Sequence, residues 1–259
     1  MSFILLLNLK RRFIHNQRKA QNKFRVKNCQ KFDRIIKLSI IVSPMPVKMR
    51  KRTMTYRFFK RTGDIILALI ALILLSWLIL LVTIINAILT KGHPFYIDHR
   101  KGKYGRDIGI IKFASMELDA DTNPEKYLNK KQMKQWKKER KVDDDPRITK
   151  FGKILRKTSI DELPQLINIL IGSISIVGPR PITERELVMN FTPEERDKLL
   201  SLKPGLTGNW AVNGRNSSEY KTHRRQELEL EYIDKISFFF DIKIILKTFV
   251  VVFNMKNAR

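Results

Sequence analysis

The chain of 259 residues, 43% of them hydrophobic, is long enough for one modest domain with additional segments. Its 51 lysines and arginines against 25 aspartates and glutamates give a net charge of +26, which predicts an anionic partner: nucleic acid, an acidic membrane face or phosphorylated substrates. The single cysteine, Cys29, excludes an intrachain disulfide framework and a cysteine-based zinc cluster.

The first 53 residues form a basic segment with 15 lysines and arginines and one acid, Asp33. Its early apolar run, Phe3 to Leu7, is too short to span a bilayer or to form a convincing signal peptide. We therefore interpret residues 1–53 as a poorly ordered basic arm.

An uncharged stretch from Ile65 to Thr90 is long enough to cross a hydrocarbon core, which needs about 20 apolar residues. Basic residues flank it on both sides, so the tendency of basic flanks to stay in the cytoplasm gives a spanning helix no preferred orientation. A re-entrant hairpin, which returns on the side where it entered, would satisfy both flanks. Residues 54–90 are therefore predicted to be a membrane-embedded helix or re-entrant hairpin.

Short apolar runs alternate with three glycines over residues 95–116, a pattern that predicts two small strands joined by a turn. His93 and His99 lie in and near this segment. Two histidines without a third ligand are more typical of solvated residues than of a metal site.

A lysine-rich helix is predicted over residues 130–141. Its Trp136 is compatible with two positions: at a membrane interface, where an aromatic ring and basic heads are both satisfied, or on the solvated surface of the domain.

The stretch from Arg156 to Pro181 combines two adjacent carboxylates with an apolar helix. Pro164 is tolerated only in a first helical turn, where its missing N–H needs no partner. The helix is therefore predicted to begin between Ile160 and Leu163.

Cap-type residues precede the two acids. Glu162 lies three residues after Ser159, the spacing at which a side chain can reach back to a capping amide. Asp161 and Glu162 would then lie at the positive end of the helix, where backbone dipoles help to keep a carboxylate ionised. Acids at a helix start are also favoured for stability alone, so this pair by itself does not establish a site.

The residues after the acids, 163–171, are apolar enough to predict a helix packed into a core rather than a solvated one. Two prolines then fix the backbone around Arg180 and pre-organise its planar guanidinium to bind a phosphate. With Arg156 and Lys157 on the other side, anion-binding groups flank both carboxylates. This arrangement suits chemistry on a phosphate bridged by a divalent metal with carboxylate ligands.

Three further helices are predicted in the C-terminal part. The first begins at Thr192-Pro193, with two glutamates in its first turn. A glycine-rich loop, residues 204–216, follows and carries Arg215; its glycines would let backbone amides approach a phosphate. A charged helix is predicted over residues 220–234. The last apolar segment, residues 236–253, contains Asp241 and two lysines, which argues for a helix on or against the membrane surface rather than a second span.

The block DPRITKFGKILRKTSIDELPQLINILIGSISIVGPRP, residues 145–181, resembles the signature of the bacterial sugar transferases. These are monotopic phosphoglycosyl transferases, which move a sugar phosphate from a UDP-sugar to a polyprenyl phosphate such as undecaprenyl phosphate. The loop PGLTGNWAVNGRN, residues 204–216, resembles the family's second signature, and FFKRTGDIILAL, residues 58–69, its membrane-entry motif. Around the predicted strands the chain shares these residues with the family pattern: Arg100, Gly102, Lys112, Phe113 and Met116.

The resemblance implies an α/β, mostly helical, compact catalytic domain over residues 91–259, with an N-terminal re-entrant membrane helix hairpin and interfacial amphipathic helices. The domain would lie on the cytoplasmic face of the bacterial cytoplasmic membrane and carry out the first membrane step of exopolysaccharide, capsule or glycan assembly. MTYRFFKRTGD, beginning at Met54, is similar to the usual start of the family. The upstream residues would then come from a start codon placed too early.

The resemblance also implies roles for site residues. Asp161 would attack the sugar-bearing phosphate, release UMP and hold a phosphosugar covalently, while Glu162 would deprotonate or orient the incoming lipid phosphate. Mg²⁺ held at Asp161 is the expected cofactor. The expected phosphate contacts are Arg100, Lys112, Arg156, Arg180 and Arg215. The expected partners are a UDP-sugar donor, a polyprenyl phosphate acceptor and membrane lipids, without nucleic acid, and a homodimer is compatible with the resemblance.

Four residues depart from the family pattern. Trp77 stands where a proline usually breaks the hairpin, Asp98 and Ala211 replace glutamines, and Ala114 replaces a basic residue. These departures leave open a catalytically impaired member that acts as a membrane scaffold for polysaccharide assembly. A direct single-displacement transfer and a membrane-tethered nucleic-acid binder are further alternatives, although the apolar surroundings of Asp161 fit the last one poorly. The motifs do not reveal which sugar is moved.

Overall fold

The computed structural model describes residues 53–139, 142, 144–214 and 223–253, all within one compact unit, Val47–Arg259. Helices predominate over two small sheets, which confirms the predicted mostly helical α/β class. The basic arm predicted for residues 1–53 lies outside the described residues, except for Thr53. The α-helices and strands are α2 (Met54–Leu89), β1 (Phe95–Lys101), β2 (Asp107–Phe113), α3 (Lys130–Glu139), α4 (Lys150–Lys157), α5 (Gln165–Ile171), β3 (Ser175–Val177), α6 (Glu184–Asn190), α7 (Pro193–Leu200), β4 (Gly205–Thr207), α8 (Asn209–Asn213), α9 (Arg224–Lys235) and α10 (Phe238–Phe253). The described residues also form three 3-10 turns: η1 (Lys103–Gly105), η2 (Pro124–Lys126) and η3 (Ile160–Glu162).

Strands β1 and β2 form an antiparallel hairpin, which confirms the two strands predicted over residues 95–116. The register pairs Phe95 with Phe113, whose rings stack with 5.3 Å between their centroids. In the turn, Gly105 adopts a φ of +74°, which glycine reaches without steric penalty. Ile110 and Phe113 of β2 are each only 1% exposed, so this strand forms the inner side of the hairpin.

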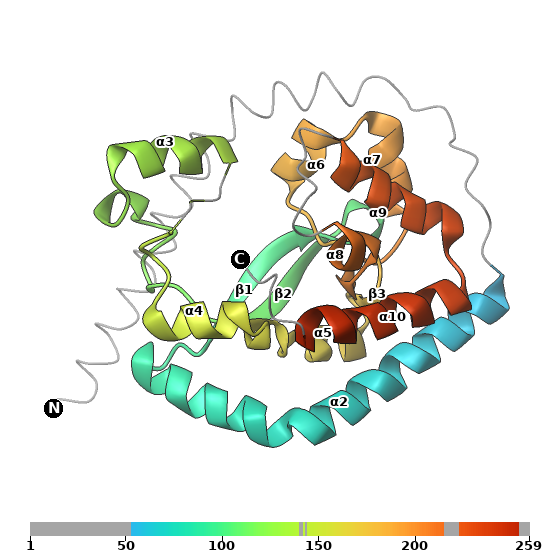
Figure 1. Ribbon diagram of the computed structural model, residues 1–259, viewed down its shortest axis with the longest axis horizontal. Coiled ribbons are helices and arrows are strands. Elements are labelled where there is room, and N and C mark those ends of the chain that lie inside the picture. Colours follow the sequence, from blue (N-terminus) through green and yellow to red (C-terminus); the bar gives the residue numbers. More distant parts are fainter. Residues whose placement is uncertain (1–52, 140–141, 143, 215–222, 254–259) are drawn as a thin grey trace, which may run out of the picture. The chain divides into compact units, whose positions relative to one another are not determined.

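Helix α2 is continuous over 36 residues, which agrees with the helix predicted for residues 54–90 as one of two alternatives, the other being a re-entrant hairpin. Figure 1 shows a bend in its middle part. Near the middle of its sequence, the Ser76 hydroxyl donates to the Ile73 carbonyl at 2.8 Å, an interaction that often accompanies helix bending. The helix is long and apolar enough to cross a membrane, and most of its side chains are not buried in the protein.

Polar side chains attach both ends of α2 to the same folded domain. Near the first end, Arg61 donates to two carbonyls in α5 at 2.6 and 2.8 Å. The buried Asp64 accepts hydrogen bonds from a side chain and a backbone amide of β3 at 2.8 and 3.1 Å. Near the other end, the Asn86 amide donates to the carbonyls that flank the hairpin, at 2.7 and 2.9 Å.

Helix α5 packs against α2 on one side and β2 on the other. Leu166 and Ile169 are buried there in a cluster with Ala68 of α2 and Ile110 of β2. This confirms the predicted core helix for one face only, because Ile167 and Ile171 on the other face are 43% and 71% exposed.

A second core lies among β3 and the helices α6, α7, α9 and α10, where Tyr232 and Val177 are almost fully buried. Strands β3 and β4 pair in parallel and bring the two signature segments together. Thr192 caps α7, and Glu195 returns a bond to the cap backbone, which confirms the predicted helix start.

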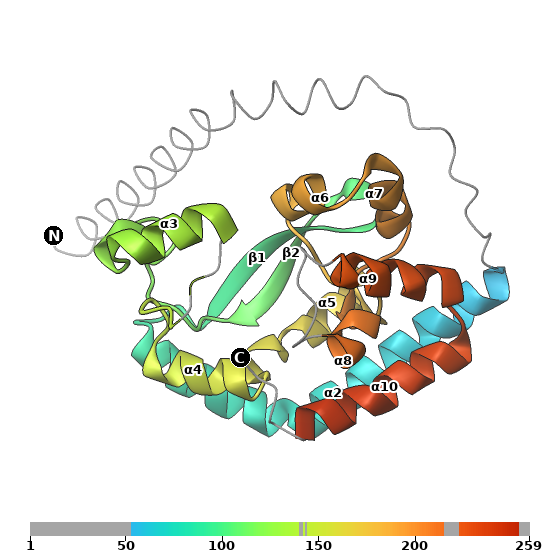
Figure 2. The same cartoon turned by 45° about the horizontal axis from the view of Figure 1, so that its top comes forward.

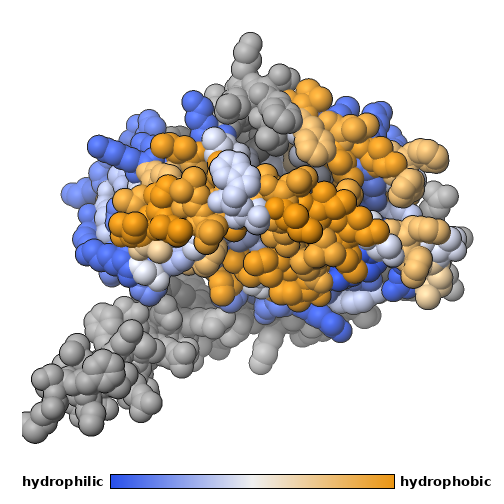
Figure 3. Space-filling view, turned by 90° about the horizontal axis from the view of Figure 1, so that it is seen from below, coloured by the Kyte–Doolittle hydropathy of each residue, from blue (hydrophilic) through white to orange (hydrophobic). Residues whose placement is uncertain are grey.

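Helix α10 lies beside the first turns of α2, as Figure 2 shows. Asp241 of α10 accepts hydrogen bonds from Tyr56 and Lys60 of α2 at 2.9 and 2.8 Å, and from Tyr232 of α9 at 2.7 Å. Seen from the side on which α2 lies, the domain presents a broad hydrophobic surface (Figure 3). The exposed apolar side chains of these two helices include Ile73, Leu74, Trp77, Leu80, Phe239, Leu246 and Phe249.

Helix α3 forms where the lysine-rich helix was predicted, and Figures 1 and 2 both place it away from α2. Its Trp136 ring lies 5.5 Å from the guanidinium carbon of the buried Arg147. These observations favour the interpretation of α3 as a solvated helix over the membrane-interface alternative.

Candidate active site

Helix α4 ends directly before the two adjacent carboxylates. The Thr158 hydroxyl donates to the Ile154 carbonyl at 2.8 Å, so this residue closes α4 instead of capping the next helix. Ser159 then reverses the chain with a left-handed backbone, φ 57°, and its side chain makes no capping bond. The predicted cap at Ser159 is therefore wrong, because the reversal precedes the helix.

Asp161 and Glu162 lie in the 3-10 turn η3, which follows this reversal. Helical structure thus begins at Ile160, as predicted, but as a tighter turn. The α-helix proper begins at Gln165 with Pro164 as its N-cap, where the missing proline N–H leaves no donor unsatisfied. The two acids consequently project from a rigid corner between α4 and α5.

Both carboxylates are half-buried. The pKa of Asp161 is raised to about 6, mainly by burial and then by the negative charge of Glu162, while Lys112 and Arg156 oppose the change. A backbone hydrogen bond at the turn lowers the pKa, in the expected direction, but burial and the neighbouring charge outweigh it. Among the described residues, no lysine or arginine forms an ion pair with Asp161.

Arg156, in the last turn of α4, faces the same corner. Its Nε donates to the Ser115 hydroxyl at 2.8 Å. Burial lowers the pKa of the Arg156 guanidinium, and the nearby Asp161 carboxylate opposes this. Gly152 allows the approach, because a Cβ atom there would overlap the Ser115 carbonyl, and it lies one helical turn before Arg156 on the same face.

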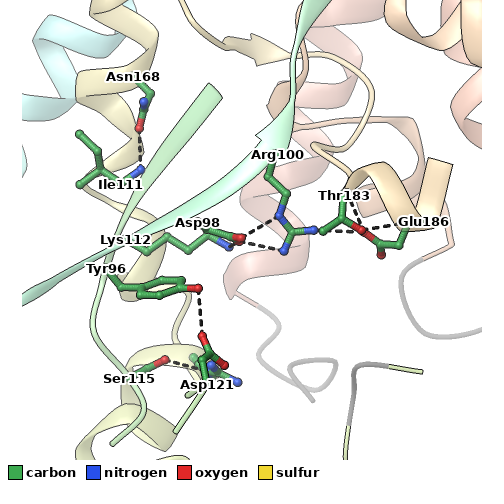
Figure 4. Close-up of polar contacts among 11 residues, drawn as sticks. Tyr96, Asp98, Arg100, Ile111, Lys112, Ser115, Asp121, Asn168, Thr183 and Glu186 are labelled. Carbon is green, nitrogen blue, oxygen red and sulfur yellow. Dashed lines mark hydrogen bonds and ion pairs between the residues drawn. The ribbon is translucent and has the colours of Figure 1, made fainter. Parts of the chain in front are cut away.

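The hairpin contributes Lys112 and Arg100, which both bind Asp98 (Figure 4). Arg100 donates to both Asp98 oxygens at 2.9 and 2.8 Å, and the Lys112 ammonium lies 3.1 Å from Oδ2. Burial favours the protonated form of Asp98, but the hydrogen bonds and charge of Arg100, followed by Lys112, outweigh it and lower its pKa. Lys112 thus lies close enough to Asp161 for its charge to act on that carboxylate, whereas Arg100 is connected to Lys112 only through their shared partner, Asp98.

Asn168 of α5 holds the hairpin against the segment that carries the carboxylates. Its Oδ1 accepts the Ile111 amide at 2.9 Å, and its Nδ2 donates to the Gly109 carbonyl at 2.8 Å (Figure 4 shows the first bond). This residue was not predicted as part of the site. Its amide in the middle of an apolar run was the available signal, since a buried amide requires partners.

Arg180 belongs to a neighbouring group of side chains. Its backbone amide donates to the buried Glu229 at 3.0 Å, and its exposed guanidinium lies 5.0 Å from the Trp210 ring centroid. Burial raises the pKa of Glu229 to about 7, although Arg180 and Arg225 oppose this. Arg180 is connected to the hairpin through Glu186. The charge of Arg180 helps to lower the pKa of Glu186, and Glu186 forms an ion pair with Arg100 of β1.

The glycine-rich loop packs against the Arg180 loop. Gly205 donates to the Pro179 carbonyl at 2.8 Å, Gly178 donates to the Thr207 carbonyl at 3.0 Å, and a Cβ atom at Gly205 would overlap the Gly178 nitrogen. These glycines therefore have a packing role that the sequence analysis did not foresee. Arg215, the fifth predicted phosphate contact, lies outside the described residues.

The described residues contain no group of three or more histidine, cysteine, aspartate or glutamate side chains that could hold a metal ion alone. His93 and His99 are both exposed. Asp161 and Glu162 supply two adjacent carboxylates, a donor set that suits Mg²⁺ when substrate phosphates and waters complete the coordination.

Comparisons with known proteins agree with one another. The family model described as bacterial sugar transferase matches residues 55–255. The chain is 40% identical over 191 residues to the exopolysaccharide production protein ExoY of Sinorhizobium fredii, covering 73% of this chain and 83% of that protein. It is 37% identical over 205 residues to the undecaprenyl-phosphate galactose phosphotransferase of Salmonella typhimurium, covering 78% and 42%. It is 36% identical over 202 residues to the UDP-glucose:undecaprenyl-phosphate glucose-1-phosphate transferase of Escherichia coli, covering 74% and 39%. The chain thus spans less than half the length of the last two relatives.

Proposed function

Because this chain belongs to the bacterial sugar transferase family, we propose that it transfers a sugar 1-phosphate from a UDP-sugar to a polyprenyl phosphate such as undecaprenyl phosphate, and releases UMP. The names of the Salmonella and Escherichia relatives support this reaction, and the name of the ExoY relative supports a place in exopolysaccharide assembly. The observation that carries the proposal is the half-buried Asp161, with Glu162, Lys112 and Arg156 around it.

Asp161 acts as the nucleophile in this proposal. A carboxylate oxygen bonds to the sugar-bearing phosphorus, the bond from that phosphorus to the bridging oxygen breaks, and UMP leaves with the electron pair. An oxygen of the polyprenyl phosphate then attacks the same phosphorus and displaces the carboxylate, which yields polyprenyl diphosphate sugar. With a pKa of about 6, Asp161 is mostly ionised at pH 7 and is less strongly hydrated than an exposed aspartate.

The neighbouring side chains serve the two phosphate substrates. Glu162 removes a proton from the incoming lipid phosphate or orients it, because it lies in the same turn as the nucleophile. Lys112 and Arg156 bind the donor diphosphate, since both lie close enough to influence the Asp161 carboxylate. Arg180 and Arg215 are proposed as further phosphate contacts. Arg100 has carboxylate partners on all three guanidinium nitrogens, so it has the least capacity for a direct contact.

The carboxylate pair fits a divalent cation. Two adjacent, half-buried carboxylates repel each other, as the raised pKa of Asp161 reflects, and a cation would relieve this repulsion. We assign Mg²⁺ to Asp161 because this ion is commonly bound by one or two carboxylates together with substrate phosphates. Bound there, it would neutralise negative charge on the donor diphosphate.

The hydrophobic surface supports a position at the cytoplasmic membrane. One substrate is a soluble nucleotide sugar and the other a lipid, so the reaction requires a site where the two phases meet. The exposed apolar side chains of α2 and α10 are suited to lipid contact (Figure 3). We place the catalytic domain on the cytoplasmic face.

We propose a re-entrant path for α2, which its anchors to the domain support. A straight helix of 36 residues would extend roughly 54 Å at 1.5 Å per residue, more than a hydrocarbon core of about 30 Å. Arg61 and Asp64 near one end, and Asn86 near the other, bind the same domain. Both ends therefore lie on one side of the membrane, and the bent middle, with Trp77 65% exposed, enters the lipid.

UMP release from a panel of UDP-sugars tests the function. The wild-type protein in nanodiscs that contain polyprenyl phosphate should release UMP from at least one donor, and Asp161→Asn should reduce release to background. Asp107→Asn is the matched control. Asp107 is the first residue of β2 and its side chain is 77% exposed, so this variant should remain active. Release at the normal rate by Asp161→Asn would refute the proposed nucleophile. A wild-type protein that releases no UMP from any donor would favour the scaffold alternative.

A further inference from the structure

The register of the hairpin places three charged residues on one face. Asp98 and Arg100 are two residues apart on β1 and therefore point to the same side. Asp98 pairs with Ile110 on β2, so Lys112, two residues farther along, is its diagonal neighbour and within reach of a long side chain. The geometry of the strands alone thus brings both cations to one carboxylate.

Asp98 is the centre of this cluster (Figure 4). Arg100 occupies both carboxylate oxygens as a two-pronged donor at 2.9 and 2.8 Å, and Lys112 shares the second oxygen at 3.1 Å. The side chains of Asp98, Arg100 and Lys112 are only 15%, 18% and 24% exposed. A planar guanidinium that binds both oxygens fixes the orientation of the carboxylate, which in turn fixes the position of the ammonium.

Arg100 is held from its other side by Glu186, 3.1 Å from Nη1. Glu186 belongs to the capping box of α6, where the same oxygen accepts the Thr183 amide and hydroxyl, each at 2.9 Å (Figure 4). Burial favours the protonated form of Glu186, but these donors, Arg100 and Arg180 together lower its pKa, so it carries a charge at neutral pH. The cluster is therefore attached to the start of α6, whose capping box forms without a bound substrate.

Lys112 has two carboxylates in its neighbourhood. Asp98 binds it directly at 3.1 Å, whereas Asp161 lies in the turn η3, which packs against β2, and forms no ion pair with Lys112 in the described part of the chain. A lysine side chain is flexible, so an ammonium without a fixed partner would move to the nearest unpaired carboxylate. A direct pair between Lys112 and Asp161 would occupy the oxygen that has to attack phosphorus.

We propose that Asp98 is a positioning residue, which holds Lys112 beside Asp161 but apart from it, so that the ammonium is available to the donor diphosphate and the nucleophile stays unpaired. Arg100 and Glu186 serve this arrangement by orienting Asp98. The inference rests on the proposed function, because it assigns the task of Lys112 to the same donor.

A double-mutant cycle tests whether Asp98 acts through Lys112. Asp98→Asn and Lys112→Met should each lower kcat/KM for the UDP-sugar by about 10- to 100-fold, the loss expected for groups misplaced by about 1 Å. If Asp98 acts through Lys112, the double variant should remain within about 3-fold of Lys112→Met alone. A double variant whose loss is the product of the two single losses would overturn the inference.

Two further variants separate positioning from folding. Asp98→Glu retains the negative charge and should recover part of the activity lost in Asp98→Asn, at an unchanged KM for the lipid acceptor. Asp107→Asn, on the same hairpin, should match the wild type in activity and in melting temperature. Equal activity of Asp98→Glu and Asp98→Asn would count against the inference. If the wild type itself releases no UMP, the proposed function fails as well; multiplicative losses in an active wild type refute only the role of Asp98.

Discussion

Replacing Asp161 with asparagine should stabilise the fold while it abolishes transfer. The folded state raises the pKa of this group from its usual 3.8 to about 6, so it binds the proton more tightly than the unfolded chain does. The stability that this group contributes is complete below pH 3.8 and is lost as the pH rises through about 6. A difference of about two pKa units corresponds to roughly 3 kcal/mol, and because the side chain is only half-buried we expect about 1–3 kcal/mol at pH 8.

The assay is thermal unfolding of both proteins in nanodiscs without divalent cations, between pH 4 and pH 8. Asp161→Asn should melt higher than the wild type by roughly 2–12 °C at pH 8, given about 2–4 °C per kcal/mol for a domain of this size. The corresponding difference in the free energy of unfolding should shrink to less than about 1 kcal/mol near pH 4. Asp107→Asn, at an exposed position, should show no such pH-dependent difference. A variant that melts lower than the wild type at pH 8 would refute the assignment of Asp161 as a buried carboxylate without a compensating ion pair.

Three further predictions follow from the same geometry. The rate of UMP release should fall about tenfold per pH unit below about pH 6, because transfer requires the ionised Asp161; a pH–rate profile that stays flat down to pH 5 would exclude this group as the nucleophile. Asn168→Ala should lower the melting temperature by an amount equivalent to roughly 2–4 kcal/mol, since it leaves the backbone groups of Ile111 and Gly109 without partners; an unchanged melt would contradict this anchoring role. In a cysteine-free background, cysteines placed at Thr53 and Lys91 should both react with a membrane-impermeant thiol reagent from the cytoplasmic side of sealed vesicles, and reaction of the two from opposite sides would show that α2 spans the bilayer.

Local signals predicted much of the fold. Alternating apolar residues and glycines predicted the hairpin, and the Thr192-Pro193 start predicted α7, because such patterns act over a few residues. The long apolar stretch predicted the membrane-type helix α2 as well. These elements depend on neighbours in the sequence, so a single sequence contains the information.

The corner that carries the carboxylates was harder to predict. The sequence around Ser159 has the residues of a helix cap, but Thr158 closes α4 and Ser159 takes a left-handed backbone, which leaves Asp161 in a 3-10 turn. The pKa of Asp161 likewise depends on burial, which raises it, and on Lys112 of the distant strand β2, which opposes the change. Asp98 was noted only as a departure from a pattern, because Glu186, which holds Arg100 from its other side, lies 86 residues away from Arg100 in the chain. Contacts of this kind appear only when the fold is known.

The most direct test of the account is to look for the phosphosugar on Asp161. Incubation with a UDP-sugar and Mg²⁺, without any lipid acceptor, should release UMP in an amount close to that of the enzyme. Mass spectrometry should then find a sugar phosphate on the peptide that carries Asp161, and polyprenyl phosphate should remove it. If UMP appears only when the lipid acceptor is present and no modified peptide forms, the transfer occurs in a single displacement and the covalent role of Asp161 is contradicted.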